Sequence, residues 1–475
     1  MAAQRTGHLS QPNQGRNIVK PNLMENRHDY LRLEELSCGV IATSAINVSY
    51  KLGLFTLLNQ SAKTVAELAA ALEIGERPAL ALTDALTSIG ILARDRAGYF
   101  KLKHPLTDKL FSKLVELDQL WVKAKSGDRE ALLAIALEYG KAGSTLPRQI
   151  GRKVFGVTIT ANIVFAQRYQ LFEMLLGKKR SLTFLAKAMD LDRKLVCALL
   201  NNLMVFGLVS GNERGYRLTD LAAAFLDKDK ESYFGNIISV IGSAGNKTAA
   251  GELAEAVRKN APNISSGGDI WVENEAAAVA ALEFAKDQFR VTWLPASEVA
   301  AKIDFSQNKQ YLDIAGGPGA MTIQILRLQP HLRAVITDIA PTGYALLKAK
   351  EYGVADRLVV VKSNMFTEPF PPGADVVMLS QIIHDWPEGK NLALIKKIAD
   401  YLPKGGKLLI HERLLDESRN GPLTTALQSL FMLIWTEGRQ YTASELKSML
   451  QKAGLETLRI SLSAAGFSVI EAKKV

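Results

Sequence analysis

The sequence predicts an α/β fold class, in which two mainly helical modules precede a C-terminal domain with a doubly wound, mostly parallel sheet. The chain has 475 residues, more than one hydrophobic core supports. Residues 35–110 and 153–226 each combine helical apolar periodicity with a short hairpin pattern. From about Ser306, short apolar strands alternate with helices as far as the C-terminus.

Composition and charge narrow the class of protein. The 48% of hydrophobic and 22% of charged residues are typical of a globular protein, and no apolar run reaches the roughly 20 residues that span a bilayer. The two cysteines, Cys38 and Cys197, lie far apart, which argues against a disulfide scaffold and favours the cytoplasm. The net charge of +10 comes without a dense basic run, so we expect solvated surface charge rather than a nucleic-acid surface.

The N-terminal segment, residues 1–34, is expected to be a disordered arm. It is polar, contains Pro and Gly, and lacks the apolar region of a secretory signal. Its Arg residues and its few acids leave an organelle transit peptide as the alternative.

The first module, residues 35–110, has the pattern of a winged helix. In TVAELAAALEI, Thr64 is the expected N-cap and Glu67 the acid of a capping box. A further helix runs through ALALTDALTSIG, and ILARDRAGYFKL is typical of two short strands about a turn.

The same pattern returns 117 positions later without a gap, for example from 54 to 171 and from 90 to 207. A register held this long indicates an internal duplication, so residues 153–226 are predicted to be a second winged-helix module. Residues 111–152 would be a helical connector and residues 227–305 a helical linker to the last domain.

Winged helices raise the hypothesis of DNA binding through the third helix. In both copies that helix, ALALTDALTSIG or LVCALLNNLMVFG, has hardly a basic residue to reach phosphate or guanine. We therefore expect these helices to be buried against another subunit, in a dimerisation role, and expect neither nucleic acid nor a membrane as a partner.

The last domain, residues 306–475, begins with the strand YLDIA and a glycine-rich turn. Residues 313–319 read DIAGGPG and are followed at once by a helix. Glycines allow a sharp turn and let a ligand approach the main chain, and open α/β sheets bind ligands at the carboxyl ends of their strands. A second strand, RAVITDI, ends at Asp338, where an acid can hold ribose hydroxyls. A nicotinamide cofactor could use the same features, and Asp338 could instead cap the helix near Thr342.

The segment ADVVMLSQIIHDWPEGKNLALIKKIADYLPKGGKLLIHERLL, with GRQYTASELKSMLQKAGLE after it, resembles the small-molecule O-methyltransferases of the plant caffeate and bacterial polyketide type. The resemblance extends over residues 252–475. It implies a Rossmann-like class I methyltransferase domain, S-adenosylmethionine as cofactor, no metal, and a homodimer built by the winged helix. It also implies methylation of a hydroxyl on a small aromatic or polyketide-like secondary metabolite.

The resemblance assigns residues to the cofactor site by position. The turn and the second strand would supply Asp313, Gly316, Gly317, Gly319 and Asp338, and the remaining positions would be Asn364, Met365, Phe366, Ser380 and Thr292. The family has an acid where this chain has Asn364, whose amide oxygen still accepts a hydrogen bond.

His384, which is expected at the end of a strand, corresponds to the family's general base, one of six histidines in the chain, and Glu412 to the acid that orients it. An imidazole can take the proton of a hydroxyl as the methyl group is attacked. A structural His384 that caps the next helix is the alternative. The second acid of the plant members falls on Gln440, which carries no charge. That departure supports a second hypothesis, a relative that keeps the cofactor but catalyses hydroxylation, decarboxylation or a pericyclic step.

The acceptor pocket would be lined by positions that match the family's substrate-binding residues, namely Asp385, Met432, Trp435 and Gln288. Met and aromatic side chains there would sandwich a flat ring, and plain packing in the core is the alternative for each of them. The extra N-terminal module is expected to extend a dimer interface or to cover the acceptor cleft. A DNA-binding regulator with a ligand-sensing domain is the third hypothesis.

Overall fold

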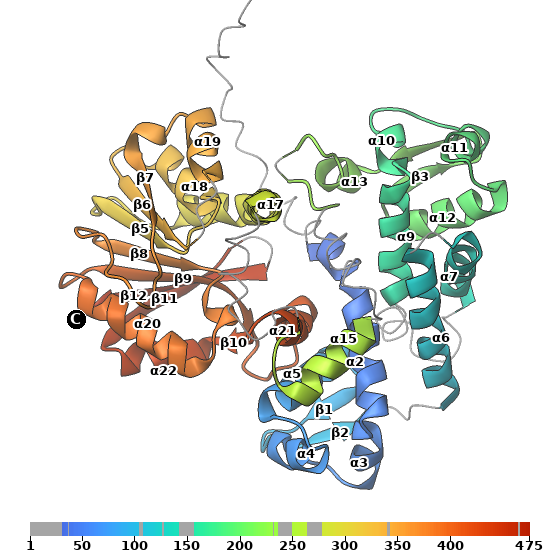
Figure 1. The fold of residues 1–475 in the computed structure, drawn as a ribbon, viewed down its shortest axis with the longest axis horizontal. Coiled ribbons are helices and arrows are strands. Elements are labelled where there is room, and N and C mark those ends of the chain that lie inside the picture. The colour runs from blue at the N-terminus through green and yellow to red at the C-terminus, as the bar shows by residue number, and fades with distance from the viewer. Residues whose placement is uncertain are drawn as a thin grey trace, which may run out of the picture.

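The computed structural model describes residues 31–36, 38–103, 108–125, 128–141, 156–230, 232–235, 249–263, 278–339, 343–463 and 466–475. They form two small helical modules with hairpins and an α/β domain (Figure 1). Residues 31–36 are helical, so the disordered arm predicted for residues 1–34 is wrong over its last four residues. The rest of that prediction lies outside the described residues.

The first module contains four helices and a hairpin: α2 (Gly39–Lys51), α3 (Leu54–Gln60), α4 (Val65–Ala71), α5 (Glu76–Ile89), β1 (Leu92–Arg94) and β2 (Phe100–Leu102). The capping box at the start of α4 is confirmed. The Thr64 hydroxyl accepts the amide proton of Glu67 at 3.3 Å, and the Glu67 carboxylate accepts that of Thr64 at 2.7 Å. This exchange satisfies two amide groups that the first helical turn leaves without partners.

The second module repeats this order: α9 (Gly156–Arg168), α10 (Leu171–Leu175), α11 (Leu182–Met189), α12 (Arg193–Val205), β3 (Val209–Asn212), β4 (Gly215–Leu218) and α13 (Asp220–Phe225). The bounds of α2 and α9 differ by 117 positions, the offset seen in the sequence. Helices α6 (Asp108–Lys125) and α7 (Arg129–Lys141) lie between the modules, and α15 (Ala249–Lys259) and α17 (Ala278–Lys302) lead to the α/β domain.

The α/β domain is built on the strands β5 (Gln310–Ile314), β6 (Arg333–Asp338), β7 (Leu358–Lys362), β8 (Val376–Ser380), β9 (Lys407–Leu415), β10 (Tyr441–Thr442), β11 (Leu455–Leu462) and β12 (Phe467–Lys474). Their order is β11-β12-β9-β8-β5-β6-β7, with the short β10 beside β9. The strands from β9 to β7 pair in parallel, and β12 is antiparallel to both of its neighbours. The predicted doubly wound, mostly parallel sheet is confirmed, and the chain ends in the antiparallel hairpin of β11 and β12.

Both faces of the sheet are covered, as Figure 1 shows. Alternate residues of β5 point to opposite sides: Tyr311 packs with α17, α18 (Ala320–Leu328) and α19 (Tyr344–Glu351), whereas Leu312 and Ile314 pack with α20 (Glu388–Tyr401) and α22 (Ala443–Lys452). This period of two is what a sheet buried between helical layers requires. Because β5 lies between β6 and β8 and the chain crosses in opposite senses from it, a ligand crevice is expected at the carboxyl end of β5.

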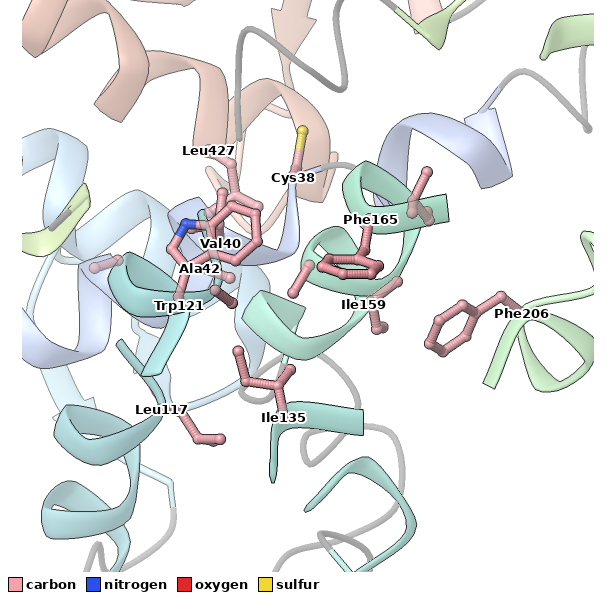
Figure 2. Close-up of a cluster of buried hydrophobic side chains, with 14 of the residues drawn as sticks. Cys38, Val40, Ala42, Leu117, Trp121, Ile135, Ile159, Phe165, Phe206 and Leu427 are labelled. Carbon is pink, nitrogen blue, oxygen red and sulfur yellow. The ribbon is translucent and has the colours of Figure 1, made fainter. Parts of the chain in front are cut away.

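Helix α21 (Leu423–Trp435) joins the α/β domain to the first module. It packs against α5, α2 and α15, and its Leu427, Leu430 and Leu433 belong to the same buried cluster as the two modules. Figure 2 shows Leu427 close to Val40 of α2. The sequence analysis expected α5 to be buried against another subunit. It is instead buried against α21 of its own chain.

Within the described residues, no single helix is long and apolar enough to cross a membrane. One bent pair of helices, Leu31–Lys51 with Leu54–Gln60, is long and apolar enough to span a membrane by length and composition alone. Its residues Val40, Ile46 and Leu54 are buried inside the protein.

Candidate active site

The glycine-rich turn follows β5 directly and uses left-handed backbone conformations. Ala315, Gly317 and Gly319 have φ of 53°, 50° and 81°, and Gly319 is the residue before the first turn of α18. Glycine adopts such angles without strain. At Gly316 the constraint is steric, because a Cβ atom would lie 2.6 Å from Cγ of Asp313. The turn therefore folds tightly over the carboxylate of the first strand.

Asp313 is fully buried beneath that turn. Its Oδ2 accepts the hydroxyl proton of Thr322 at 2.5 Å, while its Oδ1 has no partner within the described residues. Burial and the nearby charge of Asp338 raise the pKa of Asp313 to about 7, against the effect of its hydrogen bonds. Besides Thr322, the buried Tyr311 hydroxyl interacts with this carboxylate. An acid covered by a glycine turn at the carboxyl end of β5 lies where an open α/β sheet binds its ligand.

Asp338 lies at the end of β6, where the sequence analysis expected it. Its Oδ2 accepts the backbone N–H of Gly317 at 2.9 Å, so the acid of the second strand meets the turn after the first. The alternative role as a helix cap is wrong, because α19 begins at Tyr344 and Gly343 occupies its N-cap position.

The ends of β7 and β8 bring further predicted residues to the same edge. The Asn364 side-chain oxygen accepts the N–H of Phe366 at 2.9 Å, and the Lys397 ammonium donates to the carbonyl of Met365 at 2.8 Å. The Ser380 hydroxyl lies 3.0 Å from Nδ1 of His411. The first two contacts hold backbone groups just after β7, and the third joins the side chain at the end of β8 to its neighbour on β9.

Two further residues at this edge, Gln381 and Trp386, were not assigned to the site from the sequence. The Gln381 amide donates to the Thr292 hydroxyl at 2.9 Å and so ties α17 to the end of β8. The Trp386 ring meets Phe366 edge to face at 4.9 Å. The positive φ of Gln381, 59°, is not readable from its residue type, whereas an aromatic residue directly after His-Asp was a usable signal.

His384 lies not at the end of a strand but in a 3₁₀ turn, η3 (Ile383–Asp385), four residues after β8 ends. The predicted strand position is therefore wrong. So is the alternative role as a helix cap, because Pro387 precedes α20. Its Nδ1 lies 2.7 Å from Oε2 of Glu412 on the neighbouring strand β9, and Oε1 of Glu412 accepts the N–H of Ile383 at 2.8 Å.

The environment of His384 favours its protonated form. Burial lowers the pKa of His384, but the charges of Glu412 and Asp385 and the hydrogen bond to Glu412 outweigh burial and raise the pKa from 6.5 to about 9. Asp385 Oδ1 is 3.6 Å from Nε2, too far for a hydrogen bond but close enough for charge attraction. Gln440 is buried, and its amide has no partner within the described residues. Asp385 thus supplies a second carboxylate where Gln440 does not.

The predicted acceptor residues come from two helices. Gln288 is half-buried on α17, one turn before Thr292. Met432 and Trp435 lie on the last turn of α21. Gly438, just beyond, is so close to His384 that a Cβ atom there would overlap the carbonyl oxygen of His384. The end of α21 is therefore held beside the histidine. No group of three or more His, Cys, Asp or Glu residues that could hold a metal is found in the described part of the chain.

The fold and the strand-edge residues define a class I S-adenosylmethionine-dependent methyltransferase domain, and comparison with known proteins agrees. The model of the O-methyltransferase domain family matches residues 251–456. The 3-hydroxy-5-methyl-1-naphthoate 3-O-methyltransferase of Streptomyces sahachiroi is 30% identical over 313 residues, which cover 64% of this chain and 88% of that protein. Human N-acetylserotonin methyltransferase, solved in complex with S-adenosylmethionine, superimposes with a TM-score of 0.61 at 24% identity over 70% of this chain and 99% of its own.

The chain belongs to this O-methyltransferase family. It is an enzyme that transfers a methyl group from S-adenosylmethionine to oxygen. The third hypothesis of the sequence analysis, a DNA-binding regulator, is not supported by these relatives.

Proposed function

We propose that the enzyme methylates a hydroxyl of a small aromatic or polyketide-like metabolite, with His384 as the general base. Among the relatives are the naphthoate 3-O-methyltransferase and the tetracenomycin polyketide synthesis 8-O-methyl transferase of Streptomyces glaucescens, which is 28% identical over 62% of this chain. The observation that carries the proposal is the 2.7 Å contact between His384 Nδ1 and Glu412, which leaves Nε2 for the acceptor.

The cofactor site in this proposal lies along the strand edge. S-adenosylmethionine, when bound, supplies an electrophilic methyl group on a positively charged sulfur. The buried Oδ1 of Asp313 and the turn over it fit the polar methionine end. Asp338 would hold the ribose. The remaining contacts would come from Gly316, Gly317, Gly319, Asn364, Met365, Phe366, Ser380 and Thr292.

The proton follows a defined route. With Glu412 accepting Nδ1–H, the neutral imidazole has its lone pair on Nε2. The acceptor hydroxyl gives its proton to Nε2 as its oxygen forms the bond to the methyl carbon and the sulfur–carbon bond breaks. The products are a methyl ether, a neutral thioether and imidazolium, which Glu412 and Asp385 stabilise by charge. Such a proton transfer raises the reaction rate about 10²–10⁴-fold. The remaining rate acceleration comes from alignment of the acceptor oxygen with the methyl group.

The acceptor ring would lie between the last turn of α21 and α17. Met432 and Trp435 offer apolar surfaces for a flat ring, and Gln288 and Asp385 offer polar groups at its edge. The Trp435 indole N–H is buried and has no partner within the described residues, so a polar group of the acceptor could accept from it.

The test is a panel of phenols incubated with S-adenosylmethionine carrying a labelled methyl group, followed by mass spectrometry. His384→Asn is expected to lower kcat about 10²–10⁴-fold and to leave the dissociation constant of the cofactor within about threefold. His331→Asn is the matched control, because His331 lies at the surface and its ring contacts the carbonyl of Phe305. Wild-type kcat in His384→Asn would refute the role of the base.

Three further expectations stay predictions. The enzyme is expected in the cytoplasm, without nucleic acid or membrane as partners. The family resemblance implies a homodimer, and pairing of the two modules within one chain is the alternative.

A further inference from the structure

The two N-terminal modules pack on each other, and the helix that follows each module packs on the other module. Helices α2 and α9, which occupy equivalent places in the duplication, pack against each other. Helix α7, which follows the first module, packs on α9 of the second, and α15, which follows the second module, packs on α2 of the first. Reciprocal contacts of this kind are what a two-fold pair of subunits shows, with an element exchanged between them. Here one chain makes them alone.

The methyltransferase domain rests on only one half of this pair. Its helix α21 packs on α5 and α2 of the first module and on α15. Figure 1 shows α12, the counterpart of α5, on the side of the pair away from α21. The second module precedes the domain in sequence, but the helix that supports the domain is α5 of the first module, at the far end of the chain.

Buried polar contacts fix this docking. The Arg419 guanidinium, between β9 and α21, pairs with Asp84 of α5 at 2.6 Å, and both side chains are buried. The Arg413 guanidinium on β9 pairs with Glu34 at 2.7 Å. Buried pairs of this kind need both partners in place, so they set one orientation of the two bodies.

Arg77 of α5 reaches the backbone beside the catalytic residues. Its Nη1 donates to the carbonyl oxygens of Thr436 and Gly438, at 3.0 Å each. Gly438 in turn packs on the backbone of His384 and Asp385, where no Cβ atom fits. One guanidinium of the first module thus holds the segment 436–438 that lies against the histidine.

The second module has neither an arginine at the position equivalent to Arg77 nor an acid at the position equivalent to Asp84. Adding 117 to 77 and 84 gives Lys194 and Asn201, and both are exposed on α12. The amide of Asn201 donates to Cys197 of its own helix. The two copies have therefore diverged: the first carries the charges that dock on the methyltransferase domain, and the second does not.

We propose that the first module serves in cis as the subunit partner of the methyltransferase domain, with Arg77 as a positioning residue that holds the segment 436–438 against His384. This inference rests on the proposed role of His384 as the base, and it goes further in that a single chain forms a complete active site. The duplicated module would then take the place of a second subunit.

The first test needs no substrate. Hydrogen–deuterium exchange of wild-type protein, Arg77→Met and Lys194→Met is followed in peptides across residues 430–440. Arg77→Met is expected to speed exchange there at least about tenfold, because the segment loses both of its bonds to the first module, whereas Lys194→Met leaves exchange unchanged. Equal exchange in the two variants would overturn the positioning role.

The second test is kinetic. Arg77→Met is expected to lower kcat about 10- to 100-fold, as misplacement of a catalytic group by about 1 Å does, with the cofactor dissociation constant within threefold of wild type. Arg77→Lys, which keeps the charge and an ammonium donor but not the planar guanidinium, is expected to recover part of kcat. If kcat is unchanged in Arg77→Met but falls strongly in His384→Asn, the positioning role of Arg77 is refuted, whereas the role of His384 as the base is still supported.

The third test uses wild-type protein and does not depend on the stability of a variant. Light scattering after gel filtration is expected to give the mass of one chain, 51.9 kDa, and specific activity is expected to stay constant from nanomolar to micromolar enzyme. A stable dimer whose activity falls on dilution would overturn the proposal.

Discussion

Glu412 allows a quantitative test of the proposed base. The carboxylate contacts His384 Nδ1 at 2.7 Å and also accepts the N–H of Ile383 at 2.8 Å. Glu412→Gln keeps the size of the side chain and removes its charge. It keeps only one of the two acceptor oxygens, so it also loses one of the two hydrogen bonds that Glu412 accepts from His384 and Ile383.

The expected magnitude follows from the contributions to the pKa of His384. Burial opposes protonation, and Glu412 is the largest contribution that favours it, ahead of Asp385. An opposite charge at this distance changes a pKa by about 1–3 pH units. The pKa of His384, about 9 in the wild-type protein, should therefore fall to roughly 6–8 in Glu412→Gln.

The measurement is an NMR titration of protein labelled in its histidine rings, between pH 5.5 and 10, without ligands. The six histidines of the chain allow the His384 signal to be assigned by its loss in His384→Asn. Glu456→Gln, at an exposed position of β11, is the control and should leave the pKa of His384 at about 9. In turnover, activity should rise with pH as His384 loses its proton, and in Glu412→Gln this rise should move to lower pH with a lower plateau. A titration identical to wild type would refute the reasoning.

Three further predictions follow from the same contacts. Gly316→Ala should abolish detectable binding of S-adenosylmethionine in calorimetry, because its Cβ would lie 2.6 Å from Asp313 Cγ; normal binding would contradict the fitted turn. Asn364→Asp should tighten cofactor binding severalfold, since a charged acceptor makes a stronger hydrogen bond, and weaker binding would show that residue 364 does not face a donor. Asp84→Ala should lower the free energy of unfolding by about 1–3 kcal/mol in a denaturant titration, because the buried Arg419 loses one partner but keeps Glu445, whereas Asn201→Ala should change it little.

Much of the fold was predictable because its signals are local. The capping boxes at Thr64 and Thr442 are written in four consecutive residues each, and both are present. The parallel strands of the sheet are short, nearly continuous apolar runs such as VVMLS and LVVVK, separated by helices with a period of 3.6, and every strand read from the sequence exists. The place of Asp338 followed from the same pattern.

The remainder depends on contacts between distant parts of the chain. Arg419 and Asp84 are 335 positions apart, and nothing near either residue says that they meet. The apolar residues of α5 correctly predicted a buried helix, but periodicity does not identify the element that buries it. A second subunit was expected there, whereas in the structure α21 of the same chain packs on α5. His384 was expected at a strand end because the polar residues after β8 give no sign of a 3₁₀ turn.

One measurement tests the central claim most directly: the fate of a labelled methyl group in the wild-type enzyme and in His384→Asn, with a hydroxylated aromatic acceptor. The account predicts that wild-type enzyme forms labelled methyl ether and S-adenosylhomocysteine in equal amounts, and that His384→Asn binds the cofactor normally but forms both about 10²–10⁴-fold more slowly. Release of S-adenosylhomocysteine without a labelled ether, or full turnover by the variant, would contradict it.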